Sequence, residues 1–360
     1  MCASGACETC PAPKILMTAD AVGGVWQYSV DLIAHLATRG AQVLLATMGP
    51  RPDAAKKSRL AEVPGVTLCE NDYKLEWMDR PWIDVDAAGD WLLELAHQFQ
   101  PDIIHLNGYA HAALPWQAPV VVVAHSCVYS WWQAVHNRKP PQPEWSEYCT
   151  RVSAGLRAAD LVISPSASMA ASLSENYGIP TERIKVIHNF SESPIYSGSP
   201  KEPGYLSAGR AWDVAKNLQM LDDIGAGLPW PVRIAGALPH HALITQMHQA
   251  SIYVHPALYE PFGLAILEAA RAQCCLILAD IPSLRELWDG VAAFVNPHDR
   301  KAWIETLTRL AEDRTERERL GQLARSRADR YTASRSIGQY FSAYTLLIES
   351  RRDARKGVAA

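Results

Sequence analysis

Residues 259–270, YEPFGLAILEAA, carry most of the information about fold and site in this chain of 360 residues. Pro261 disfavours helical geometry at the residue before it, and the apolar run after Gly263 has the composition of a buried helix. The pattern therefore predicts Glu260 in a loop and Glu268 inside the following helix. A carboxylate among Leu, Ile and Ala side chains is costly unless polar groups meet it, and ligand hydroxyls would do so. A core helix with one solvent-reaching Glu is the alternative.

The start of the same helix is a candidate anion site. The first backbone amides of this helix, from Phe262 through Gly263 and Leu264 to Ala265, have no helical acceptor and lie at the positive end of the helix dipole. The segment therefore combines phosphate-binding amides with two carboxylates that can bind sugar hydroxyls.

Composition sets the broad class of the protein. Apolar residues make up 48% and charged residues 20% of the chain, and 34 basic against 38 acidic residues give a net charge of −4. This balance argues against general nucleic-acid affinity. We find no apolar run of membrane-spanning length and no signal-peptide pattern over residues 1–13. We expect a cytoplasmic protein of two domains that does not span a membrane; peripheral membrane contact and the oligomeric state are left open.

Two short motifs suggest metal binding but have simpler explanations. Cys7 and Cys10 form a Cys-x-x-Cys pair near Cys2, yet no second pair completes a metal site, so residues 1–13 are predicted to be a flexible tail. Asp84 and Asp86 form an Asp-x-Asp pair that precedes a predicted helix over residues 87–99, which favours an N-cap role. The sequence predicts no metal site and no cofactor.

A first series of short apolar strands alternates with helical stretches. The predicted strands cover residues 14–18, 42–47, 66–69, 102–106, 120–124, 161–163 and 185–187, with helices that include residues 87–99 and 167–177. Their continuous apolar character indicates strands covered on both faces, which means a parallel, doubly wound α/β sheet.

Ligands of such sheets bind beyond the carboxyl ends of the strands. That rule selects Gly23 and Gly24 after the first strand, Tyr109 after residues 102–106, and His125 after residues 120–124. The glycines permit close approach of a ligand to the backbone, with tight packing as the alternative. His125 is a cleft residue or a structural histidine.

Aromatic residues gather around Trp131 in a region predicted to be rich in loops. Tryptophan rings stack on the apolar faces of sugars, so Trp131 is a candidate acceptor-binding residue. Packing of a long loop is the alternative.

A second strand and helix series follows a polar, proline-containing linker over residues 191–204. Its strands are predicted at residues 205–208, 232–235, 251–255, 275–279 and 292–295, and residues 299–347 are almost all helical. Arg210 and Lys216 lie between the first of these strands and the next helix, where they can meet a diphosphate; exposed surface cations are the alternative.

Together, the glycine turn, the two cations and the Glu260-x7-Glu268 spacing resemble the retaining glycosyltransferases of family 4. Supporting pieces are residues 164–166, 185–189 and 282–286, and the similarity spans residues 14–345. The resemblance implies the GT-B architecture, in which two Rossmann-like domains face a central cleft. It places the acceptor-side domain at residues 14–195, the nucleotide-sugar domain at 196–333, and a last helix at about 334–360 packing back on the first domain.

The resemblance also assigns roles at the donor site. Arg210 and Lys216 would neutralise the donor diphosphate, and Glu268 would bind the ribose hydroxyls. Glu260 would hold the hydroxyls of the transferred sugar, helped by the amides of residues 262–264. The partners implied are a nucleotide sugar and a hydroxyl acceptor.

On the other domain, Gly23 and Gly24 would let the backbone approach the phosphates, and His125 would contact the sugar near the reacting centre. Tyr109 and Trp131 are the candidate acceptor residues. A sugar epimerase or phosphorylase of the same architecture, and a carbohydrate-binding protein without activity, are the alternative functions.

Overall fold

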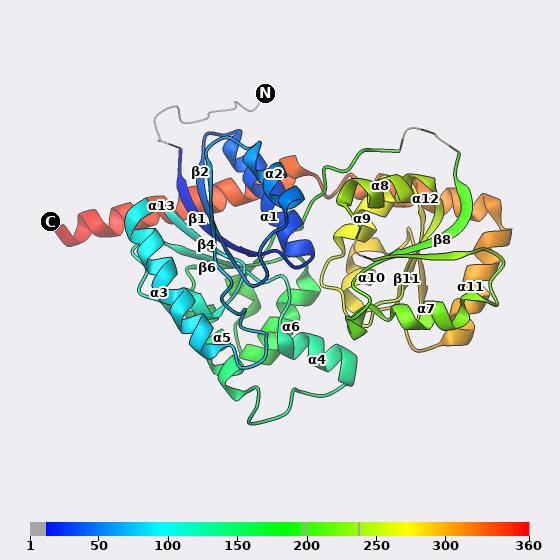
Figure 1. Ribbon diagram of the computed structural model, residues 1–360, viewed down its shortest axis with the longest axis horizontal. Coiled ribbons are helices and arrows are strands. Elements are labelled where there is room, and N and C mark those ends of the chain that lie inside the picture. The colour runs from blue at the N-terminus through cyan, green and yellow to red at the C-terminus, as the bar shows by residue number, and fades with distance from the viewer. Residues whose placement is uncertain (1–11, 197, 199, 237, 360) are drawn as a thin grey trace. The chain divides into compact units, whose positions relative to one another are not determined.

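The computed structural model describes residues 12–196, 198, 200–236 and 238–359, and it contains two parallel sheets flanked by helices (Figure 1). Cys2, Cys7, Cys10 and the rest of the predicted tail up to residue 11 lie outside the described residues, as does Ala237. The predicted α/β class is confirmed within the described part of the chain.

The first sheet has the strand order β3-β2-β1-β4-β5-β6-β7, and its pairs β1·β2, β1·β4, β2·β3, β4·β5 and β6·β7 are parallel. Its chain segment contains β1 (Lys14–Asp20), α1 (Gly24–Ala37), β2 (Gln42–Met48), α2 (Ala54–Ala61), β3 (Val66–Glu70), α3 (Trp82–Phe99), β4 (Ile103–Leu106), η1 (Ala110–Ala113), β5 (Val120–Val123), α4 (Val128–His136), α5 (Ser146–Ala158), β6 (Leu161–Ser164), α6 (Ala167–Tyr177), η2 (Thr181–Arg183) and β7 (Ile184–Val186).

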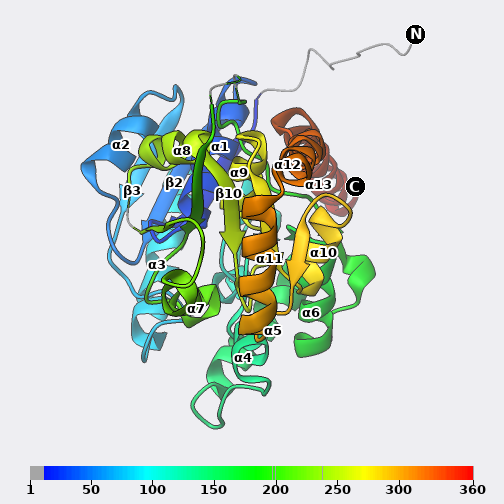
Figure 2. The same cartoon turned by 90° about the vertical axis from the view of Figure 1, so that its right-hand side faces the viewer.

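The second sheet has the order β12-β11-β10-β8-β9, and its adjacent strands are parallel. The part of the chain from residue 202 onward contains β8 (Glu202–Ala208), η3 (Val214–Lys216), α7 (Leu218–Gly225), β9 (Val232–Ala235), α8 (His240–Gln249), β10 (Ala250–His255), α9 (Leu264–Arg271), β11 (Cys275–Ala279), α10 (Pro282–Trp288), β12 (Ala293–Val295), α11 (Arg300–Glu312), α12 (Arg314–Ala328) and α13 (Ala333–Ala359). Helices α8, α9 and α12 pack next to one another, and α7 packs with α11 (Figure 2).

Burial explains why these segments form strands. All four valines of β5 and all five residues of β11 are buried, as the continuous apolar runs predict for a sheet with helices on both faces. Cys127, Cys274 and Cys275 are buried, whereas Cys69 and Cys149 are half-buried.

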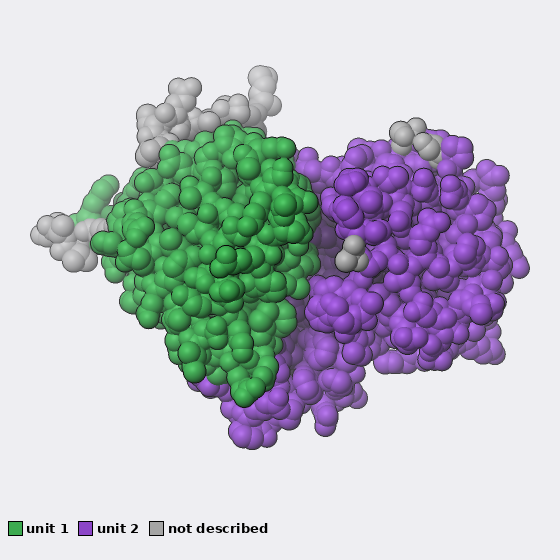
Figure 3. All heavy atoms as spheres, in the orientation of Figure 1, with its two compact units in different colours: residues 1–123, 151–161, 341–360 green, residues 124–150, 162–340 purple. Residues whose placement is uncertain are grey.

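The chain divides into two compact units that do not follow the order of the sequence (Figure 3). Unit 1 contains the residues up to 123, residues 151–161 and those from 341 onward; unit 2 contains residues 124–150 and 162–340. Helix α13 therefore contributes its first eight residues to unit 2 and the remainder to unit 1. The domain boundaries drawn from the sequence, and the cleft implied by the resemblance, stay predictions.

The segment around Trp131 is not loop-rich as predicted, because Val128–His136 forms helix α4. Aromatic residues have weak helix propensity, so this helix depends on its surroundings. Cys127 caps it, and Ser130 accepts a hydrogen bond from the Ser172 hydroxyl at 2.7 Å, which ties α4 to α6. The predicted linker is also shorter than expected, since β8 begins at Glu202.

The expected N-cap role of the Asp84 and Asp86 pair is wrong. Helix α3 begins at Trp82, five residues before the predicted start, and Pro81 is its N-cap residue. Asp84 therefore lies in the first turn, where a carboxylate still favours the helix dipole. Asp86 forms an ion pair with Arg151.

Among the described residues we find no helix that is both long enough and apolar enough to cross a membrane.

Candidate active site

The strand order of the second sheet brings two loops together. Strands β8 and β10 are neighbours in parallel, so the loop after β8, which carries Lys216, and the loop after β10, which carries Glu260, leave the same edge. Lys216 Nζ lies 2.7 Å from Glu260 Oε2, and the two side chains are 16% and 13% exposed. This ion pair is therefore largely shielded from solvent, unlike the surface pairs of α11 and α12.

Backbone contacts hold Lys216 at this position. The Leu258 amide donates to the Ala215 carbonyl at 2.8 Å, which joins the two loops directly. Asn217 adopts a left-handed backbone conformation and donates from its side-chain amide to the carbonyls of Pro256 and Pro297. Contacts with the loops after β10 and β12 therefore fix the backbone on both sides of Lys216.

Two hydroxyls fix the loop that carries Glu260. Ser283 donates to the Glu260 carbonyl at 2.5 Å, and Ser166 donates to the Pro261 carbonyl at 2.7 Å. Gly263 has φ +86°, and a Cβ at this position would come within 2.6 Å of Ile266 Cδ1. Glycine is therefore required for the turn that places Glu260 in the loop and starts α9 one residue later, as predicted.

Helix α9 starts with amides that have no helical acceptor. Its first bonds to a helical carbonyl are those from Ile266 and Leu267 to Gly263, at 3.0 and 3.1 Å. Gly263 is the N-cap residue and makes no side-chain cap. The amides of Leu264 and Ala265 are therefore oriented as an anion site requires.

Arg210 takes part in a second charged group beside this loop. Its Nη2 lies 2.7 Å from Asp213 Oδ2, and its Nε is buried without a partner among the described residues. Trp131 donates its indole N–H to Asp213 Oδ1 at 3.3 Å. The predicted acceptor residue Trp131 is therefore linked through Asp213 to a predicted donor cation.

Glu268 lies inside α9, as predicted, and its side chain is 5% exposed. The nearest charged or ionisable partner is His240, whose Nε2 lies 2.7 Å from Glu268 Oε1. His240 is the first residue of α8. A half-exposed imidazole thus covers the buried carboxylate.

The charge states of Glu260 and His255 follow from their surroundings. Burial alone would raise the pKa of Glu260, but the Lys216 ammonium and the hydrogen bond from His255 hold this pKa well below its usual range. Burial lowers the pKa of His255, against the opposing effect of Glu260. At neutral pH the group therefore contains an ammonium, a carboxylate and a neutral imidazole.

The other predicted site residues occupy strand ends as expected. Gly23, with φ +83°, is the exposed N-cap of α1 and Gly24 is its exposed first residue. Tyr109 is 3% exposed, and its amide donates to the Glu76 carboxylate. All three lie in unit 1, and their roles at a ligand stay predictions.

His125 belongs to unit 2 and follows β5 by two residues. The next residue, Ser126, donates to the Tyr259 hydroxyl at 3.2 Å. The loop that carries His125 therefore adjoins the loop that carries Glu260.

Sequence reasoning missed two residues of this group. His255 is the last residue of a predicted strand, and the strand-end rule that selected His125 would have selected it too. Asp213 lies between Arg210 and Lys216, but its link to Trp131 joins residues 82 positions apart. No local pattern signals that contact.

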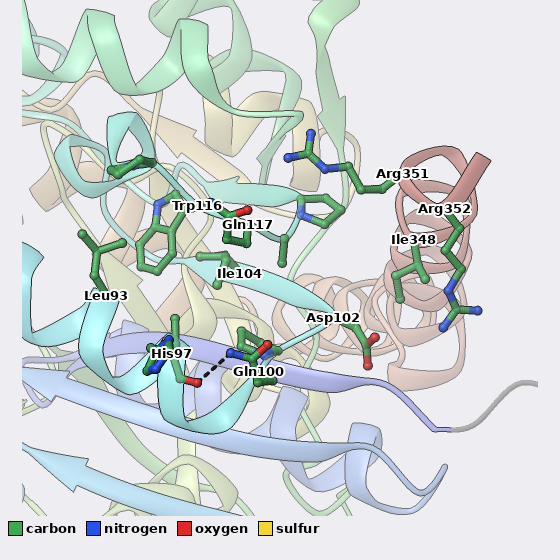
Figure 4. A pocket seen from close by; sticks show the side chains of 15 residues that line it. Leu93, His97, Gln100, Asp102, Ile104, Trp116, Gln117, Ile348, Arg351 and Arg352 are labelled. Atoms are coloured by element: carbon green, nitrogen blue, oxygen red, sulfur yellow. Dashed lines mark hydrogen bonds between the residues drawn. The ribbon is translucent and has the colours of Figure 1, made fainter. Parts of the chain in front are cut away.

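A separate cavity of about 230 Å³ lies in unit 1, between the end of α3, residues 115–119 and α13 (Figure 4). Trp116 lies on one side of it, and Arg351 and Arg352 lie on the helix at the other (Figure 4). None of the residues predicted to bind the donor lines this cavity, so it is not assigned to the site around Glu260.

Two family models match successive parts of the chain. The model described as Glycosyltransferase Family 4 matches residues 22–191, and the one described as Glycosyl transferases group 1 matches residues 225–327. Together they cover well over half of the chain. The chain belongs to the glycosyltransferases. The first match includes Gly23, His125 and Trp131, and the second includes Glu260 and Glu268.

Known proteins and structures agree with this membership. The sulfoquinovosyl transferase SQD2 of Arabidopsis thaliana is 25% identical over 282 residues, which are 65% of this glycosyltransferase chain and 54% of that protein. The chain spans about half the length of the curated relatives that it matches.

Solved structures show the fold. The sucrose-phosphate synthase of Thermosynechococcus elongatus superimposes with a TM-score of 0.79 at 18% identity, over 94% of this chain and all of that chain. The Anabaena protein Alr3699/HepE, in complex with UDP and glucose, gives 0.70 at 17% identity, over 92% of this chain and 98% of that chain. The predicted GT-B fold, with two Rossmann-like halves, is confirmed.

Proposed function

We propose that this chain transfers a sugar from a nucleoside-diphosphate sugar to a hydroxyl acceptor, with retention of the anomeric configuration. The observation that carries the proposal is the shielded Lys216–Glu260 pair at the carboxyl edge of the second sheet, beside the first turn of α9. The cation and the free amides at this strand edge match the diphosphate of such a donor, and the carboxylate matches its sugar hydroxyls.

In this proposal, Arg210, Lys216 and the amides at the start of α9 stabilise the negative charge that grows on the departing diphosphate. Fixed positive groups of this kind act where charge develops in the transition state. Glu260 accepts hydrogen bonds from the hydroxyls of the transferred sugar, and Glu268 accepts them from the ribose. The leaving phosphate takes the proton of the acceptor hydroxyl on the same face of the sugar.

The acceptor side of the proposal involves His125, Tyr109 and Trp131, with Gly23 and Gly24 approaching the phosphates. No resident cofactor or metal is proposed, because side chains and amides supply the positive potential. The cytoplasmic location and the absence of a nucleic-acid partner stay predictions. Peripheral membrane contact and oligomeric state stay open.

The test measures nucleoside diphosphate release from UDP-, GDP- and ADP-sugars in the presence of hydroxyl acceptors. UDP-glucose is the first donor to test, because HepE, which shares the fold, was solved with UDP and glucose. We expect Glu260→Gln to lower turnover about 10²- to 10³-fold, as for the loss of one electrostatic contact in a transition state. Glu305→Gln, in an exposed pair with Lys301, is the matched control and should leave turnover unchanged.

Two outcomes would contradict the proposal. Donor binding without release of nucleoside diphosphate, for every acceptor, would indicate a carbohydrate-binding protein. Conversion of the donor sugar into an isomer without release would indicate an epimerase.

A further inference from the structure

Both protein donors to Glu260 use the same carboxylate oxygen. Lys216 Nζ lies 2.7 Å and His255 Nε2 lies 3.2 Å from Oε2. Oε1 has no hydrogen-bond partner among the described residues, and it is not enclosed as an unsatisfied buried atom. The carboxylate is thus held through one oxygen and presents the other.

The tautomer of His255 follows from this geometry. An ionised carboxylate can only accept, so Nε2 must carry the proton that bonds to Glu260. The imidazole is 3% exposed and stacks on Tyr253 with an interplanar angle of 15°. Because burial keeps the ring neutral, it supplies a directed hydrogen bond to Glu260 without adding a second positive charge.

The Lys216 ammonium is also the group proposed to meet the donor diphosphate, whose charged oxygens attract it as Glu260 does. A phosphate oxygen competes with Glu260 for this ammonium. The imidazole of His255 is buried and stays within hydrogen-bonding distance of Glu260. We propose that His255 is a positioning residue, which holds Glu260 through Oε2 while Lys216 turns to the diphosphate and Oε1 accepts the hydroxyls of the donor sugar. This inference rests on the proposed transferase function and deepens it.

Among the described residues, the charged and titratable groups that act on Glu260 come from η3, β10 and the loop of Glu260 itself. Lys216 approaches from η3, His255 and Tyr253 from β10, and Tyr259 precedes Glu260 in its own loop. Tyr253 and Tyr259 have pKa values raised first by burial, and both stay neutral. Of these neutral groups, His255 is the one with a hydrogen bond to Glu260. It can therefore stabilise the carboxylate once Lys216 has other bonds.

The experiment compares His255→Phe, which keeps a flat ring but has no donor, with His255→Gln, whose side-chain amide can replace the Nε2–H. We expect His255→Phe to lower kcat/KM for the donor about 10- to 100-fold, as for one hydrogen bond to a charged group. The acid limb of its pH profile should move up by about one pH unit, since Glu260 then protonates more easily. His255→Gln should restore both. Binding of UDP alone, measured by calorimetry, should be the same in all three proteins.

Three controls keep the test decisive. Tyr253→Phe removes a hydroxyl beside the ring and should leave the acid limb in place. If His255→Phe does not fold, His255→Asn replaces it, because its shorter amide does not reach Glu260, and it should behave unlike His255→Gln. A folded His255→Phe with the wild-type kcat/KM and acid limb would overturn the inference alone. A wild-type protein that turns over no donor would remove the proposed function, and this inference with it.

Discussion

Two buried histidines, one in each sheet, have similar places and different partners. His105 lies in β4, which pairs with β1, the first strand of its sheet along the chain. His255 lies in β10, which pairs with β8, the first strand of the second sheet. His105 Nδ1 is 2.6 Å from the Tyr344 hydroxyl and its Nε2 is 3.5 Å from the Tyr28 hydroxyl. His255 instead faces the carboxylate of Glu260, beside an ammonium.

Burial does not separate these two residues, because it lowers the pKa of both. Their partners do. His105 bonds to neutral tyrosine hydroxyls of α1 and α13, which suits a structural contact, whereas His255 bonds to a charged pair at a strand edge where ligands bind. The charge of the partner is therefore a better guide to function here than the burial of the histidine.

The largest effect is expected when the positive charge beside His255 is removed. We expect Lys216→Met to lower the free energy of unfolding by about 3–5 kcal/mol, because Glu260 would remain buried without its ion-pair partner. Urea denaturation monitored by tryptophan fluorescence measures this change. The double variant Lys216→Met/Glu260→Gln should recover most of the stability and none of the turnover.

Lys301→Met is the matched control, since Lys301 and Glu305 form an exposed pair. It should change the free energy of unfolding by less than about 1 kcal/mol. A loss in Lys216→Met as small as in this control would mean that the pair around Glu260 is not shielded.

The free energy of unfolding at acid pH tests the role of His105. Burial lowers the pKa of His105 to about 3, so between pH 6.5 and 3 the unfolded chain binds a proton there that the folded chain does not. Stability must therefore fall as pH falls through this window, by up to about 1.4 kcal/mol per pH unit from this residue. In His105→Asn the fall between pH 7 and pH 5 should be shallower, as measured by urea denaturation at each pH. Equal slopes in the two proteins would show that His105 becomes protonated in the folded state.

The sequence predicted the sheets better than the site. Continuous apolar runs located the strands because parallel strands covered by helices are apolar along their whole length. Pro261 and Gly263 placed Glu260 in a loop and Glu268 in a helix, since proline restricts the residue before it and glycine permits the left-handed turn. Each of these predictions depended on neighbours in the sequence.

Contacts between distant residues could not be obtained in this way. The Lys216–Glu260 pair joins residues 44 positions apart and requires β8 to lie next to β10, which no local pattern specifies. The helix around Trp131 was missed because packing against α6 overrides weak propensity. The start of α3 was misplaced because Asp84 resembles an N-cap whether it precedes a helix or lies in its first turn.

The smallest loss of stability is expected when the hydrogen bond between the neutral groups of His105 and Tyr344 is removed. Tyr344→Phe keeps the ring that fills the space beside His105 and removes the hydroxyl at 2.6 Å from Nδ1. One neutral hydrogen bond contributes about 1 kcal/mol, so we expect a loss of about that size in urea denaturation and no change in donor turnover. Tyr344 lies in the part of α13 that belongs to unit 1, whereas Glu260 lies in unit 2. A marked loss of turnover in a stably folded Tyr344→Phe would show that His105 and its tyrosines affect the chemistry, and the distinction between the two histidines would then fail.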